Sequence, residues 1–138
     1  MNATILCVDD EENQLVLRKL ILERAGYRVL TATSAAKAIE LFRSDTVDLL
    51  IVDYYMPGMT GLALARELMR QRRVPVAVLS AYAELPGESI GAADVWITKG
   101  TGSEELLARL AELLSKSTPF RDRQRRVVES DIERRNAE

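Results

Sequence analysis

The chain has 138 residues, of which 47% are hydrophobic and 29% charged, and its formal net charge is −2 at neutral pH. This composition is typical of one globular domain that is large enough to bury its own core. A single cysteine excludes an intrachain disulfide framework, and the lack of histidine excludes a cysteine–histidine zinc cluster. With a net charge of −2, the chain lacks the overall basic excess that is typical of nucleic-acid-binding domains.

The charge is distributed unevenly along the chain. Residues 116–138 contain seven basic and five acidic residues, so they carry +2 while residues 1–115 carry −4. We therefore predict one domain over residues 1–117 and a charged tail, linker or helical extension over residues 118–138. The opening segment MNATILCVDDEE is too polar for a secretory signal or a membrane span, so we expect a cytoplasmic protein with no membrane contact.

Apolar runs alternate with helical patterns as far as residue 115. This alternation predicts an α/β fold, in which helices cover both faces of a parallel sheet. The predicted strands are residues 4–8, 28–32, 48–53, 76–80 and 95–99. Three of them contain the unbroken apolar runs ILCV, LLIV and VAVL, which are typical of strands buried on both faces. We expect these three strands at the centre of the sheet.

About five helices are predicted between and after these strands. The predicted helices are residues 13–25, which end just before Gly26, residues 34–42 with Ser34 as the cap, residues 60–70, and residues 103–115 with leucines at helical spacing. Residues 83–94 must form the fourth connection, but they contain Pro86, Gly87 and Gly91. At most a short or irregular fourth helix is expected there.

Polar side chains stand at the ends of four predicted strands. In an open parallel sheet, ligands bind beyond the carboxyl ends of the strands. Asp9 and Asp10 follow the first strand, and the third, fourth and fifth strands end at Asp53, Ser80 and Lys99. We expect three acids, one hydroxyl and one amine to converge at this edge.

These residue types suit phosphoryl chemistry. Three close carboxylates repel one another unless a cation compensates, and Mg²⁺ prefers oxygen ligands and keeps positions open for phosphate oxygens. Asp53 would attack an activated phosphoryl group to give an acyl phosphate, which Lys99 and Ser80 would bind. Each residue alone has a simpler explanation: Asp9 and Asp10 as acids that open a helix, and the others as ordinary residues at strand ends. Their combination favours a site.

The segments ILCVDDEE, LLIVDYYMPGMTG, VLSA and WITKG resemble the signature segments of response-regulator receiver domains. The resemblance covers about residues 3–115. It implies a flavodoxin-like, doubly wound five-stranded sheet in the order 2-1-3-4-5. It also implies that the phosphoryl donor is a phosphohistidine on a sensor histidine kinase or a phosphotransfer protein.

The resemblance implies a role for most of the polar residues. Asp53 corresponds to the phosphoacceptor, and Ser80 and Lys99 correspond to the hydroxyl and the lysine that contact the phosphate. The implied Mg²⁺ ligands are Asp9, Asp10, Asp53 and the backbone carbonyl of Tyr55.

Two further segments match the family. Residues 56–61 correspond to the turn after the phosphoacceptor, where Pro57 presets the backbone and Gly58 and Gly61 permit positive φ. Trp96 stands three residues before Lys99, in the place of the family's switch aromatic. It fits equally well as a half-buried packing residue whose N–H reaches solvent.

The sequence also departs from the family pattern. Gly100 replaces the proline that usually follows the lysine, so we expect a trans bond there and a looser loop. The segment from Ser80 to Lys99 is shorter than usual, which puts in doubt any partner contact or dimer through the fourth helix. Tyr55 and Tyr82 are placed to line the approach to phosphorus, and we expect them to impede water and lengthen the phosphorylated lifetime.

The leading interpretation is a phosphorylation-dependent switch whose output is contact with a downstream protein, with a homodimer also compatible. Nucleic-acid binding would require an additional domain. One alternative is a phosphorylation-independent scaffold, which Gly100 and the short fourth connection favour. A Mg²⁺-dependent phosphohydrolase is less favoured, because Tyr55 stands where such an enzyme needs a second acid. We thus expect no enzyme beyond self-phosphorylation and self-dephosphorylation.

Overall fold

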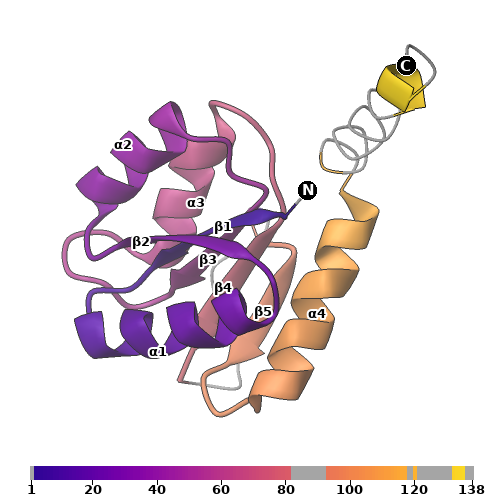
Figure 1. Cartoon of the computed structure of the whole chain (residues 1–138). Coiled ribbons are helices and arrows are strands. Elements are labelled where there is room, and N and C mark those ends of the chain that lie inside the picture. Colours follow the sequence, from indigo (N-terminus) through magenta and orange to yellow (C-terminus); the bar gives the residue numbers. More distant parts are fainter. Residues whose placement is uncertain (1, 82–92, 118–119, 121–131, 136–138) are drawn as a thin grey trace.

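In a computed structural model of the chain, which describes residues 2–81, 93–117, 120 and 132–135, a five-stranded sheet lies between layers of helices (Figure 1). All pairings are parallel, and the order is β2-β1-β3-β4-β5. This confirms the predicted flavodoxin-like topology. The strands are β1 (Thr4–Val8), β2 (Arg28–Ala32), β3 (Leu49–Asp53), β4 (Val76–Ser80) and β5 (Val95–Thr98).

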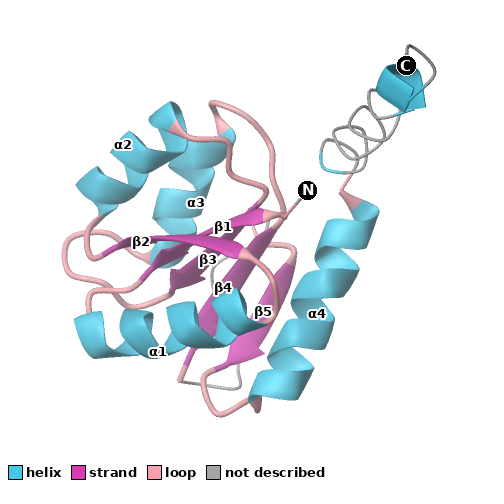
Figure 2. Cartoon of the chain, in the orientation of Figure 1, coloured by secondary structure: helices cyan, strands magenta, loops and turns pink. Residues whose placement is uncertain are grey.

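Helices cover both faces of the sheet (Figure 2). They are α1 (Glu12–Arg24), α2 (Ala35–Ser44), α3 (Gly61–Met69) and α4 (Ser103–Lys116). Each matches a predicted helix with its ends shifted by no more than two residues, and α4 is the helix predicted as the fifth. The predicted short fourth helix falls mostly on residues 82–92, which lie outside the described residues.

The sheet separates two apolar cores. Ile5 and Cys7 of β1 pack on the side of α1 and α4, whereas Leu6 and Val8 pack on the side of α2 and α3. β1, β3 and β4 are buried along their whole length, which confirms that the strands with unbroken apolar runs form the centre. Burial also raises the pKa of Cys7 to about 12, so its thiol stays neutral.

Two strand ends differ from the prediction by one residue. The third strand begins after Asp48, whose carboxylate accepts a hydrogen bond from the Thr4 N–H at 2.7 Å. The fifth strand ends at Thr98. The Lys99 N–H still donates to the Ser80 carbonyl at 2.7 Å, but the chain turns there, so Lys99 belongs to the loop.

The turn after β3 corrects one prediction about glycine. Gly58 has a φ of +83°, as expected, but Gly61 does not adopt positive φ. Instead Gly61 opens α3, and its N–H donates to the Tyr54 carbonyl at 2.8 Å. An added Cβ at Gly61 would overlap the backbone carbonyl of Asp53 and lie 3.0 Å from the Val52 side chain. The position therefore requires glycine for close packing of α3 on the end of β3.

Few residues after α4 are described. Phe120 is buried in the core between the sheet and α1 and α4, and its N–H donates to Ser117 Oγ at 3.5 Å. Residues 132–135 form an exposed helical turn. The domain boundary at residue 117 stays a prediction. None of the helices in the described ranges is long and apolar enough to cross a membrane.

Replacing Gly61 with alanine should lower the free energy of unfolding by about 1 to 3 kcal/mol, because the new methyl group overpacks the α3–β3 junction. Gly102→Ala is the matched control, since a Cβ there meets nothing within 4 Å and the backbone φ is an ordinary −64°. Urea denaturation of both variants measures the difference. Equal stability of the two variants would contradict the steric explanation.

Candidate functional site

Three acids lie together at the carboxyl edge of the sheet. Asp9 and Asp10 directly follow β1, and Asp53 is the last residue of the neighbouring strand β3. One carboxylate oxygen from each acid lies within 4.8 Å of the others. Asp9 is fully buried and Asp53 is 5% exposed, whereas Asp10 is exposed. The group is therefore mostly enclosed and meets solvent at Asp10.

Lys99 joins this group as predicted. Its Nζ lies 2.8 Å from Asp53 Oδ1 and 3.8 Å from Asp9 Oδ2. Ser80 is the buried last residue of β4 and directly follows Leu79, which pairs with Asp53 in the sheet. The structure thus brings the predicted acids and Lys99 into contact and places Ser80 on the adjoining strand end.

The surroundings of Asp53 oppose its ionisation. Burial raises the pKa of its carboxyl group, and the negative charges of Asp9 and Asp10 raise it further. The hydrogen bond and positive charge of Lys99 act in the opposite direction. A second cation beside these acids would relieve their mutual repulsion.

Sequence reasoning missed Arg18, which also reaches the acids. It lies on the inner side of α1 and is only 8% exposed, with Nη1 3.5 Å from Asp9 Oδ2. Its position was available from periodicity, since it follows the buried Leu15 by three residues and precedes the buried Leu22 by four. The spacing of these two leucines therefore indicates that Arg18 lies on the same face of α1.

A group of aromatic residues begins directly after Asp53 in the chain. The buried ring of Tyr54 meets the ring of Tyr55 edge-on, with 4.7 Å between the ring centroids. It also packs against the ring of Trp96, with 5.3 Å between the centroids. Trp96 is half-buried, as the packing interpretation predicts, and its switch role stays a prediction. Tyr55 is 56% exposed, whereas Tyr82 lies outside the described residues.

The loop after β5 carries Lys99 into the site. No peptide bond in the described ranges is cis, so the bond between Lys99 and Gly100 is trans, as expected. The Thr101 N–H donates to the Thr98 carbonyl at 2.9 Å, which closes a turn around Lys99. This turn holds the lysine beside Asp53 without a proline.

The sequence model of the family described as response regulator receiver domain matches residues 5–111. The chain belongs to this family. Response regulator GtcR of Aneurinibacillus migulanus is 33% identical over 131 residues, which cover 93% of this chain and 54% of GtcR. This receiver domain spans about half the length of the curated relatives it matches.

Solved receiver domains have the same fold. A CheY-like receiver domain from Methanospirillum hungatei superposes with a TM-score of 0.78 at 28% identity, over 84% of this chain and 96% of that one. TrrA of Thermotoga maritima in complex with Mg²⁺-BeF superposes with a TM-score of 0.74 at 34% sequence identity. The match covers 80% of this chain and 98% of TrrA. TrrA in complex with the histidine kinase ThkA superposes with a TM-score of 0.72 at 35% sequence identity. The match covers 81% of this chain and 98% of TrrA.

Receiver domains are generally non-enzymatic signalling domains that interact with histidine kinases and typically bind Mg²⁺. The residues present here fit that ion, because three carboxylates offer oxygen ligands within 4.8 Å of one another. In addition, Asp9 Oδ2 is buried without a hydrogen-bond partner among the described residues, although Arg18 Nη1 and Lys99 Nζ lie within 4 Å of it. Such an oxygen atom still has a lone pair to offer to a cation.

In metal-free buffer, Asp53→Asn should become increasingly stable relative to the wild type as the pH rises from about 4 to about 7. Because the pKa of Asp53 is raised above its ordinary value of 3.8, the folded protein holds this proton more tightly than the unfolded chain does. The wild type therefore loses stability as pH rises through the raised pKa, and asparagine has no such proton. Urea denaturation across this pH range measures the difference.

The control is Glu23→Gln, which removes an exposed acid from α1, away from the three acids. A stability difference between Asp53→Asn and wild type that stays constant with pH would contradict the raised pKa.

Proposed function

We propose that this receiver domain is a phosphorylation-dependent switch that accepts a phosphoryl group on Asp53 with Mg²⁺ bound beside it. The contact that carries the proposal is the 2.8 Å approach of Lys99 Nζ to Asp53 Oδ1, inside a cluster of three carboxylates. Asp53 ends β3 and Lys99 lies in the loop after β5, so the fold brings the two together from distant parts of the sequence.

The transfer would form one bond and break another. A carboxylate oxygen of Asp53 attacks phosphorus, the bond from phosphorus to the donor's imidazole nitrogen breaks, and the imidazole leaves with the bonding electrons. The ammonium group of Lys99 favours the ionised form of Asp53 before transfer and pairs with a phosphoryl oxygen afterwards. The Ser80 hydroxyl, at the adjoining strand end, donates a hydrogen bond to a second oxygen.

We assign the metal ligands to Asp9, Asp10, Asp53 and the backbone carbonyl of Tyr55. When bound, Mg²⁺ would neutralise charge that develops on the phosphoryl oxygens. The oxygen-only ligand set supports Mg²⁺, and so does the Mg²⁺-BeF complex of the related TrrA.

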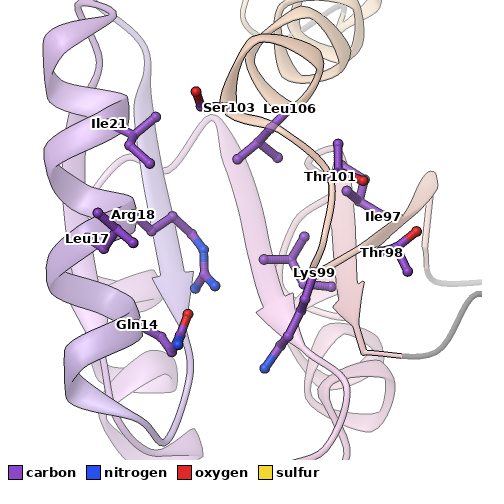
Figure 3. A pocket seen from close by; sticks show the side chains of 11 residues that line it. Gln14, Leu17, Arg18, Ile21, Ile97, Thr98, Lys99, Thr101, Ser103 and Leu106 are labelled. Carbon is purple, nitrogen blue, oxygen red and sulfur yellow. The ribbon is translucent and has the colours of Figure 1, made fainter.

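The proposed donor is a histidine kinase or a phosphotransfer protein, which the complex of TrrA with ThkA supports. The surface of α1 next to the site is also suited to a protein donor, because Val16, Leu17 and Leu20 are exposed apolar residues. Leu17 lines the same pocket as Lys99 (Figure 3). A donor that covers this pocket would bury these side chains as it delivers its phosphoryl group.

The output would be contact with a downstream protein. Trp96 is the proposed switch residue, because its ring packs on Tyr54, the neighbour of Asp53 in the chain. A shift of the strand end on phosphorylation would be transmitted through this contact to the surface. A homodimer is also compatible with this output, and nucleic-acid binding would require an additional domain.

Incubation with acetyl phosphate and Mg²⁺ should add one phosphoryl group to the wild type and none to Asp53→Asn, as measured by intact mass. A chelator should abolish the addition, because the acids would again repel the incoming phosphate. Labelling of Asp53→Asn would refute the assigned acceptor. No labelling of the folded wild type by acetyl phosphate or by a kinase would favour the phosphorylation-independent scaffold, and steady phosphate release from many substrates would favour the phosphohydrolase.

We also propose that Tyr55 slows hydrolysis of the phosphorylated form by shielding phosphorus from water, together with Tyr82. Its position two residues after Asp53, with the ring held edge-on against Tyr54, supports this role. Tyr55→Asn should lose the phosphoryl group severalfold faster than the wild type, whereas Tyr55→Phe keeps the ring and should decay at the wild-type rate. The decay is measured by intact mass after the donor is removed, and an unchanged or slower rate in Tyr55→Asn refutes the role.

A further inference from the structure

We propose that Arg18 is a positioning residue that shares Asp9 with the divalent ion and so weakens Mg²⁺ binding to the unphosphorylated domain. This inference rests on the proposed function, since it concerns the same group of acids. Through Arg18, α1 would raise the Mg²⁺ concentration that is needed to fill the site.

The contacts of Arg18 point into the site. Its Nη1 and Asp9 Oδ2 are 3.5 Å apart, both atoms are buried, and neither has a hydrogen-bond partner among the described residues. The same Asp9 oxygen lies 3.8 Å from Lys99 Nζ. Figure 3 shows the two cationic side chains reaching into one pocket, Arg18 from α1 and Lys99 from the loop after β5. Asp9 is therefore held between two cations.

The charges determine the sign of the effect. Three ionised carboxylates and the ammonium group of Lys99 together carry a formal charge of −2. The guanidinium group of Arg18 changes the net charge of the site to −1. A divalent ion that approaches Asp9 meets the repulsion of the positive guanidinium group of Arg18. Arg18 Nη1 and Asp9 Oδ2 are themselves buried, which limits the screening of this repulsion by water.

A purely structural role makes a different prediction. If Arg18 only anchors α1 to the end of β1, its removal would change stability and leave metal affinity unchanged, or weaken it by releasing Asp9. If Arg18 competes with the ion, its removal leaves Asp9 Oδ2 free for metal and increases the affinity. The direction of the change in the Mg²⁺ dissociation constant separates the two roles.

The test uses the full chain without phosphoryl donor and measures Mg²⁺ binding to Arg18→Met, Arg18→Lys and Lys19→Met. Trp96, the only tryptophan, serves as the fluorescence reporter because its ring packs on Tyr54, the residue that follows Asp53, and calorimetry provides an independent measure. Methionine fits the apolar inner face of α1, lysine retains the charge, and Lys19→Met removes a neighbouring charge from the exposed face. Thermal unfolding verifies that each variant is folded.

We expect Arg18→Met to bind Mg²⁺ at least about fivefold more tightly than the wild type, with Arg18→Lys and Lys19→Met close to the wild type. The Mg²⁺ concentration that half-saturates acetyl phosphate labelling should fall in parallel. Unchanged or weaker binding by folded Arg18→Met overturns the inference while leaving the proposed function intact. If the wild type itself binds no Mg²⁺, the proposed function fails, and this inference fails with it.

Discussion

The crowding of three carboxylates at one edge of the sheet is the constraint on which the site depends. Asp9 and Asp53 are buried at the ends of adjacent strands, where water cannot separate their charges. Such an arrangement is stable only with cations nearby, and the structure supplies Lys99 at 2.8 Å from Asp53. The same unbalanced negative charge makes the site suited to a divalent ion and, with that ion, to a phosphoryl group.

The sheet makes this crowding possible. Its central strands are buried on both faces, so they are held rigidly by two apolar cores. The parallel register brings the carboxyl ends of β1 and β3 to the same edge, and Gly61 lets α3 pack directly on the end of β3. The packing of the sheet and of α3 therefore determines where the oxygen atoms of the acids lie.

The site is connected to the surface in two directions. On one side, Tyr54 links the segment that carries Asp53 to Trp96 of β5 and to the exposed ring of Tyr55. On the other side, Arg18 links Asp9 to α1, whose outer face carries exposed apolar residues. Both connections are compatible with the proposed switch, in which a donor reaches the acids and the phosphorylated state is reported at the surface.

The sequence by itself determined the layered α/β fold, the central strands and the residues that end them. Unbroken apolar runs and helical spacing depend on local periodicity, and parallel strands must bring their carboxyl ends to one edge, so Asp9, Asp53 and Lys99 were predictable as neighbours. Only the tertiary structure decided that Arg18 meets Asp9, that Tyr54 joins two other rings and that Gly61 is required for space. These features depend on distances between side chains of different elements, and such distances are determined by packing in three dimensions.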